Sequence, residues 1–196
     1  MTERFDLTFD YLCPFARIAN ETVVEALEAG ADWDVGFRVF SLSQTKVEEG
    51  ETPVWERPPD GEGVRGVKAL QWAIAVRDRF PDRFHAWHLG AYEARFTDGA
   101  DLDDEDVLRR VATSAGLDPH QIEEIVATGE PLDVLAREHT ELVKRWAVFG
   151  VPTFIRGDEA VFVRLMERHV RSDVEQVLSM LEATNLNEFK RTRIPR

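Results

Sequence analysis

The sequence predicts an α/β protein, because a strand–helix–strand opening and a strand–strand–helix ending enclose a long block of helices. Three observations carry this prediction. Apolar and polar residues alternate near both ends of the chain, apolar residues recur with a helical period between them, and prolines or capping residues precede several of the helical segments. The element order is therefore βαβ…ββα. With 196 residues, we expect one domain spanning residues 1–196.

The opening is predicted to be a βαβ unit. Residues 4–10 alternate between apolar and polar side chains, as a strand does. Pro14 suits the first position of the helix that follows, and Gly30 ends it. Residues 33–39 alternate again and predict a second strand. We expect a right-handed crossover and a parallel pair.

The middle of the chain is predicted to be helical. Residues 43–63 are rich in proline, glycine and glutamate and predict an exposed, mobile loop. Five helices follow, with starting or capping residues predicted at Val67, Phe84 after Pro81, Asp101 or Asp103, Asp118, and Pro131. Gly150 closes the helical block.

The ending is predicted to be a hairpin and a helix. Residues 153–155 and 160–163 are short β-type runs, and the tetrapeptide at 156–159 suits the turn between them. The last helix is expected over residues 171–183.

Composition and charge exclude several classes of function. Apolar residues make up 43% of the chain, which indicates a folded protein, and the formal net charge of −13 argues against nucleic-acid and anionic-membrane partners. One cysteine excludes an intramolecular disulfide. Residues 1–6 lack a signal-peptide pattern and no apolar run is long enough for a membrane span, so we expect the cytoplasm.

Cys13 is the main candidate for chemistry. If Pro14 is the first helical residue, Cys13 is the N-cap, and its sulfur accepts hydrogen bonds from the N–H groups of Phe15 or Ala16. These bonds and the helix dipole favour the thiolate, so we expect a lowered pKa and a nucleophilic Cys13. A lone cysteine is also often a small buried apolar residue, and the local pattern leaves both interpretations open.

Val151-Pro152-Thr153 is the second candidate feature. A proline after a glycine and before a strand is either an ordinary helix stop or a cis proline with a specific structural reason. The motif gains weight from its place, because it precedes the third strand of a chain that opens with Cys13-Pro14 at its first helix.

The chain resembles a known family. Residues 9–16, Phe-Asp-Tyr-Leu-Cys-Pro-Phe-Ala, are similar to the Asp-x-x-Cys-Pro-Trp-Cys segment of DsbA-like proteins of the FrnE group. Residues 150–154 resemble the cis-proline loop of that family, and the tail at 189–193 is similar to that of mycothiol-dependent nitroreductases. The resemblance implies a thioredoxin-like fold, with a core at about 4–42 and 148–185 and a helical insertion at about 64–147.

The resemblance also implies a thiol–disulfide site. Cys13 would attack a disulfide, Pro152 would face the sulfur without offering an N–H, and the backbone of Val151 would pair with the substrate. The remaining residues expected to contact substrate or co-substrate are Asp10, Pro14, Phe15 and Thr153.

One position departs from the family pattern. Ala16 stands where the second cysteine of the family falls, so an external thiol must resolve any mixed disulfide. We therefore expect a monothiol oxidoreductase with mycothiol or glutathione as co-substrate, acting on a small disulfide or electrophile. The alternatives are a thiol-dependent isomerase or transferase, of the 2-hydroxychromene-2-carboxylate isomerase or kappa glutathione transferase type, and a non-catalytic binding protein. A homodimer is left open, and no tightly bound cofactor is expected.

Other motifs are given structural interpretations. The G-x-G-x-x-G match at 61–66 follows a loop and does not predict a dinucleotide site. His85, His88 and His139 are interpreted as surface residues, and no metal site is expected. Three tryptophans of the helical block are interpreted as core residues: Trp72, Trp87 and Trp146. Asp10 is interpreted first as a cap for the turn before Cys13 and second as a proton carrier.

Overall fold

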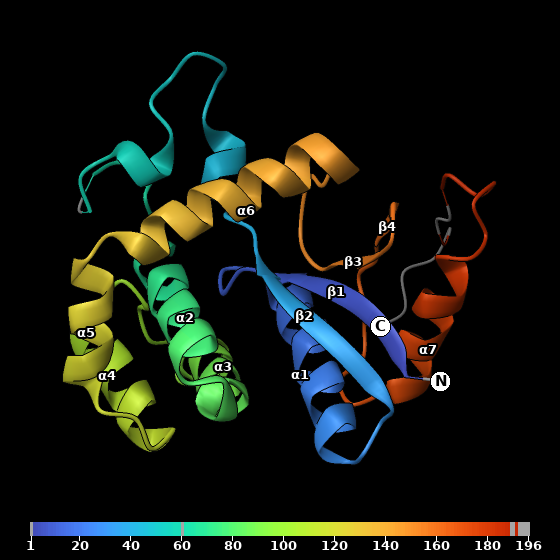
Figure 1. The fold of residues 1–196 in the computed structure, drawn as a ribbon, viewed down its shortest axis with the longest axis horizontal. Coiled ribbons are helices and arrows are strands. Elements are labelled where there is room, and N and C mark those ends of the chain that lie inside the picture. The colour runs from blue at the N-terminus through green and yellow to red at the C-terminus, as the bar shows by residue number, and fades with distance from the viewer. Residues whose placement is uncertain (1, 60, 189–190, 192–196) are drawn as a thin grey trace.

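The computed structural model describes residues 2–59, 61–188 and 191, and it confirms the α/β prediction. The thioredoxin-like core opens with β1 (Glu3–Phe9), α1 (Pro14–Glu28) and β2 (Trp33–Val39) and closes with β3 (Thr153–Arg156), β4 (Glu159–Phe162) and α7 (Arg171–Met180). Between them lie α2 (Val67–Arg79), α3 (Pro81–Phe96), α4 (Glu105–Ser114), α5 (Pro119–Ala127) and α6 (Glu130–Trp146). In Figure 1, α2 to α5 gather beside the sheet and α6 leads back from them toward β3.

The sheet brings the two ends of the chain together. Its strand order is β2-β1-β3-β4. β1 is parallel to β2, as predicted for the opening βαβ unit, and antiparallel to β3. Leu7 in β1 lies opposite Phe37 in β2 and opposite Phe154 in β3. All three side chains are therefore on one face of the sheet, where they are buried in the core. The carboxyl end of β1 leads directly into the start of α1.

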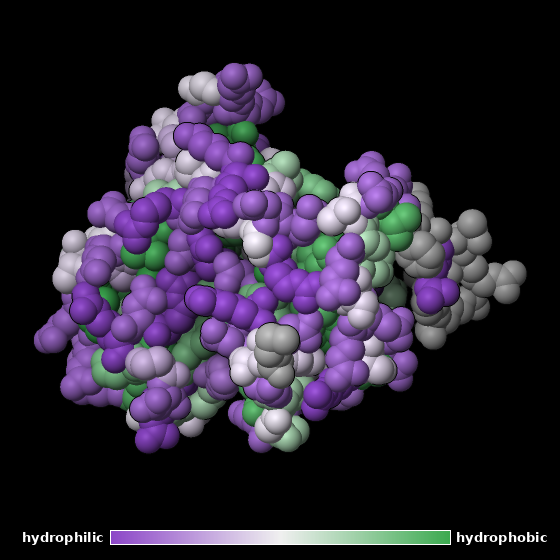
Figure 2. All heavy atoms as spheres, turned by 45° about the vertical axis from the view of Figure 1, so that its right-hand side comes forward, coloured by the Kyte–Doolittle hydropathy of each residue, from purple (hydrophilic) through white to green (hydrophobic). Residues whose placement is uncertain are grey.

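The surface seen in Figure 2 is mainly hydrophilic. On the face shown in Figure 2, hydrophilic residues cover most of the surface, and hydrophobic residues appear in small separated areas. None of the helices within the described residues has the length and apolar character needed to cross a membrane.

One helix start differs from its prediction. The N-cap of α4 is Asp104, not Asp101 or Asp103. The carboxylate of Asp103 instead accepts the main-chain N–H of Gly66, at 2.9 and 3.1 Å, just before α2 begins. The segment at 43–63 is a loop, as predicted, and it contains two short 3-10 turns, Gln44–Lys46 and Val54–Glu56.

Two histidines lie in the core, so their assignment to the surface was wrong. His88 is fully buried, and its ring stacks on Phe84. His139 is buried as well, stacks on Phe40, and accepts the N–H of Ser41 at Nδ1. Burial lowers the pKa of His88 to about 3 and that of His139 to about 4, so both rings are neutral at physiological pH.

The tryptophans divide into two groups. Trp72 and Trp87 are buried, as predicted for core residues. Trp146 ends α6 at the edge of the core, where it is half-buried, and its Nε1–H donates to the carbonyl oxygen of Gly157 at 3.0 Å. This bond ties the end of the insertion to the β3–β4 turn.

Candidate functional site

Cys13 occupies the N-cap of α1. Its backbone is extended, with φ −104° and ψ 117°, and Pro14 takes the first helical position. The Sγ atom accepts the N–H of Ala16 at 3.4 Å and donates to the carbonyl oxygen of Val151 at 3.3 Å. Only 9% of the residue is exposed. The structure thus brings together two motifs that lie 138 residues apart in sequence.

The segment facing Cys13 is held firmly. The Val151–Pro152 peptide bond is cis, and Val151, Pro152 and Thr153 are all buried. The N–H of Thr153 donates to Oγ1 of Thr8 in β1 at 2.8 Å, and the Thr153 hydroxyl donates to the carbonyl oxygen of Gly150 at 2.8 Å. The carbonyl that accepts the Cys13 thiol is therefore fixed to the same strand that leads into the Cys13 loop.

Asp10 caps the turn before Cys13. Its Oδ1 accepts the N–H of Leu12 at 2.8 Å, and its Oδ2 accepts the N–H of Leu42 at 2.7 Å. Its carbonyl oxygen accepts the N–H of Cys13 at 3.2 Å. Burial raises the pKa of this carboxyl to about 6, although the two N–H groups oppose the shift. These contacts match the capping interpretation, because both carboxylate oxygens are engaged by the loop.

A buried hydrogen-bond chain braces the same loop, and sequence reasoning missed it. Nδ1 of His88 accepts the hydroxyl of Tyr11 at 2.7 Å, and Nε2 of His88 donates to Oδ1 of Asn20 at 3.0 Å. The Asn20 amide group donates to the carbonyl oxygen of Ala16 at 2.9 Å. The chain therefore connects the residues on both sides of Cys13 through a histidine of the insertion. A buried Asn on an apolar face of α1 was the available signal.

The prediction of a lowered pKa for Cys13 was wrong. Burial raises the pKa of the thiol above its ordinary value, and this effect outweighs the opposing hydrogen bonds from the N–H groups of Ala16 and Phe15. The negative charge of Asp10 raises the pKa further, whereas the positive charge of Arg164 lowers it. The N-cap geometry is present as predicted, but its stabilisation of the thiolate is smaller than the opposing effect of burial.

The surroundings of the sulfur reach the surface through Pro14 and Phe15. Pro14 is exposed and Phe15 is half-buried, and the Arg164 guanidinium lies over the Phe15 ring at 5.3 Å from its centroid. Phe149 precedes the Gly150–Pro152 segment and is 70% exposed, with its ring 5.0 Å from that of Phe162. Aromatic side chains thus lie on both segments that hold the thiol, and Arg164, from the segment after β4, lies over one of them.

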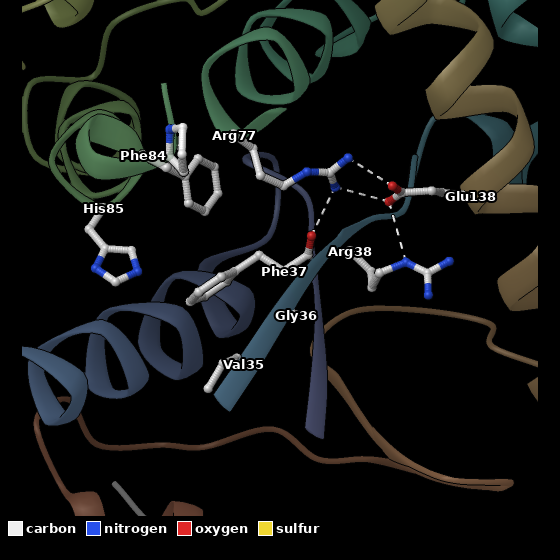
Figure 3. Close-up of a pocket in the computed structure, with 9 residues that line it drawn as sticks. Val35, Gly36, Phe37, Arg38, Arg77, Phe84, His85 and Glu138 are labelled. Carbon is white, nitrogen blue, oxygen red and sulfur yellow. Dashed lines mark hydrogen bonds and ion pairs between the residues drawn. The ribbon is translucent and has the colours of Figure 1, made fainter. Parts of the chain in front are cut away.

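A separate hollow of about 370 Å³ lies at the free edge of β2, where Figure 3 shows Arg77 and Arg38 converging on Glu138. Arg77 Nη2 lies 2.8 Å from Glu138, and Arg77 Nη1 donates to the Phe37 carbonyl oxygen at 2.9 Å. Cys13 does not line this hollow. The two arginines that line it, Arg38 and Arg77, are paired with carboxylates. We interpret this hollow as the joint between sheet and insertion.

Two other motifs considered in the sequence, a histidine metal site and a glycine-rich dinucleotide loop, have the following surroundings. Within residues 2–59, 61–188 and 191, no group of three or more His, Cys, Asp and Glu side chains is placed to hold a metal ion. The glycine-rich residues 61–66 follow a 3-10 turn and not a strand, so they lack the context of a dinucleotide site.

Comparisons with known proteins agree with this architecture. The chain is 21% identical to YwbO of Bacillus subtilis over 182 residues, covering 82% of this chain and 90% of that protein. Among solved structures, a probable DsbA oxidoreductase from Streptomyces coelicolor has a TM-score of 0.65 at 19% identity and covers 95% of this chain and 92% of its own. A 2-hydroxychromene-2-carboxylate isomerase has a TM-score of 0.64 at 17% identity and covers 93% and 97%.

These structural likenesses concern the fold alone.

The tail at 189–193, which resembles that of mycothiol-dependent nitroreductases, lies outside the described residues except for Arg191. The sequence profile described as DSBA-like thioredoxin domain matches residues 5–169, most of the chain. The chain therefore belongs to the DSBA-like thioredoxin domain family.

Proposed function

We propose that this protein is a monothiol oxidoreductase in which Cys13 exchanges with a low-molecular-weight disulfide. One observation carries the proposal: the Cys13 sulfur sits at the start of α1, 3.3 Å from the Val151 carbonyl oxygen, in a chain of the DSBA-like family. Solved proteins of similar fold are described as oxidoreductases, which agrees with this chemistry.

The reaction balances as two exchange steps. The Cys13 thiolate attacks one sulfur of a disulfide RSSR, the Cys13–S–S–R bond forms, and RS⁻ leaves and takes up a proton. A second thiolate R′S⁻ then attacks the sulfur of R, releases the Cys13 thiolate and forms RSSR′. Ala16 is fully buried and has no sulfur, so this second thiol comes from solution. Mycothiol and glutathione are the co-substrates we propose.

The residues around the sulfur assist both steps. The N–H of Ala16, 3.4 Å from Sγ, points at the atom where negative charge appears when Cys13 ionises or leaves. The Val151 carbonyl oxygen accepts the S–H of the resting thiol, and it loses that bond on ionisation. Because burial raises the pKa of the thiol, we expect the reaction rate to rise with pH beyond neutrality.

Mass spectrometry after exposure to oxidised mycothiol or oxidised glutathione tests the proposal. We expect one adduct per chain, released by the reduced thiol and absent in Cys13→Ser. If the protein is folded and Cys13 still forms no adduct, the proposal is wrong, and the non-catalytic binding protein remains as the alternative. In Ala16→Cys, a second thiol one helical turn away should release the adduct without added thiol, so the mixed disulfide should not accumulate.

A thiol-dependent isomerase or transferase is the second candidate. The observation that favours it is the enclosed thiol with a raised pKa, since a neutral S–H can donate a hydrogen bond to a bound thiolate cofactor. In this case Cys13 orients the cofactor and forms no covalent adduct. Isomerase activity that appears only with reduced glutathione, and that survives in Cys13→Ser, would favour this function over disulfide exchange.

A further inference from the structure

The segment between β4 and α7 carries several basic residues close to α1, and most of them contact a carboxylate. Arg168 lies 2.7 Å from Glu21, and His169 lies 2.6 Å from Glu25, both on α1. Arg171, which begins α7, pairs with Glu175 four residues later at 2.8 Å. The first two contacts hold the segment along α1, and all three basic side chains have a carboxylate partner.

Arg164 differs from these neighbours. It is exposed, and within the part of the chain that the structure describes its guanidinium makes no hydrogen bond or ion pair. Its guanidinium lies over the face of Phe15, 5.3 Å from the ring centroid. Such a cation–π contact fixes the position of a guanidinium while leaving its N–H donors free.

The position of Phe15 decides what Arg164 can reach. Phe15 is two residues after Cys13, and its N–H is one of the groups that stabilise the Cys13 thiolate. The positive charge of Arg164 also acts on the Cys13 sulfur. A small molecule bound to Cys13 therefore has an unpaired guanidinium fork beside it, in a protein whose net charge of −13 repels anions elsewhere.

We propose that Arg164 binds a carboxylate of the thiol or disulfide that reacts at Cys13, so that the substrates are carboxylate-bearing, peptide-like thiols. A guanidinium pairs with a carboxylate through two parallel N–H donors, and this fork is available here. The inference rests on the proposed function and narrows its co-substrate. Glutathione carries carboxylates, whereas mycothiol, a sugar thiol, carries none.

Three disulfides of nearly equal size provide the test: 3,3′-dithiodipropionate, bis(2-hydroxyethyl) disulfide and cystamine, which are anionic, neutral and cationic. The second-order rate constant of adduct formation on Cys13 is measured for each by mass spectrometry at low salt. The anionic-to-neutral ratio is compared between variants, because a change in the Cys13 pKa alters both rates alike and cancels in that ratio.

We expect Arg164→Gln to lower the anionic-to-neutral ratio about five-fold, the effect of one ion pair in contact near water. The cationic-to-neutral ratio should rise in the same variant, and 1 M salt should remove most of the difference from the wild type. Arg110→Gln removes an exposed arginine of α4 and is the matched control, with an unchanged ratio.

The outcomes separate the two proposals. If all three disulfides form adducts and both ratios are the same in the wild type and in Arg164→Gln, the carboxylate inference is wrong while disulfide exchange stands. An equal fall in Arg110→Gln also overturns it, because general electrostatics then explains the preference. If none of the three disulfides forms an adduct on Cys13, the exchange function fails and this inference falls with it.

Discussion

The buried carboxyl of Asp10 should make the stability of this protein depend on pH in a particular direction. Asp10 is 1% exposed, and burial raises its pKa to about 6 from an ordinary value of 3.8. A carboxyl with a raised pKa holds its proton more tightly in the folded state than in the unfolded state. Its favourable contribution is therefore complete below pH 3.8 and is lost as the pH rises through 6.

The size of this loss follows from the shift. About two pKa units correspond to about 3 kcal/mol in full, since each unit is worth 1.36 kcal/mol. Between pH 4.5 and 7.5 the folded state passes through most of its titration, whereas the unfolded state is already mostly ionised at pH 4.5, so about 2 kcal/mol of that total should disappear. Asp10→Asn removes the ionisable carboxyl. It also replaces one of the two acceptor oxygens with an NH₂ group, which then faces the N–H of Leu12 or Leu42.

Urea unfolding of the wild type and of Asp10→Asn at several pH values measures the effect. Subtracting one free energy of unfolding from the other cancels the titration of other groups. We expect the wild type to lose about 2 kcal/mol relative to Asp10→Asn from pH 4.5 to 7.5. Asp118→Asn, which replaces an exposed capping carboxylate, controls for the substitution itself. A difference that is constant with pH, or that grows in favour of the wild type, would refute the reasoning.

Three further predictions concern the packing around the site. His88→Leu leaves the Tyr11 hydroxyl unpaired in the core and should lower the free energy of unfolding by about 2–4 kcal/mol in urea. The double variant with Tyr11→Phe should lose less than the sum of the two single losses, and an additive loss would contradict a direct hydrogen bond. Gly36→Ala places a Cβ against the Asp6 carboxylate and should cost about 1–3 kcal/mol, recovered in part by Asp6→Ala; a stability equal to the wild type contradicts the register. Glu138→Gln removes the charge that pairs with two arginines and should lower stability by about 3 kcal/mol, and a Tm that does not move would refute this.

The fold was predictable because local patterns and global topology agree in this chain. Alternation at residues 4–10 and 33–39 and a proline at the start of α1 were enough to predict a parallel βαβ unit. The N-cap of α4 was not predictable, because three aspartates (Asp101, Asp103 and Asp104) lie just before that helix and any of them could cap it. The choice depended on Gly66, a residue far away in sequence, which engages Asp103.

The candidate site was predictable in its residues but less so in its electrostatics. The sequence pointed to Cys13 and to the Val151–Pro152 segment, and the structure places Cys13 Sγ against the Val151 carbonyl oxygen. Sequence patterns do not report how deeply a side chain is enclosed, so the sign of the Cys13 pKa shift was missed. The same limit explains His88, whose neighbours Tyr11 and Asn20 meet it only through tertiary packing.

The raised pKa of Cys13 has different consequences for the two exchange steps. Each unit by which the pKa rises lowers the thiolate fraction tenfold but raises the nucleophilicity of the thiolate about three-fold, so the attack is slowed by only about three-fold per unit. Departure of Cys13 from a mixed disulfide has no such offset, because a thiol of higher pKa is the poorer leaving group. Ala16 supplies no neighbouring thiol to assist that departure. The second step is therefore slowed more than the first, and the mixed disulfide on Cys13 is the form that should persist when the supply of reduced thiol is low.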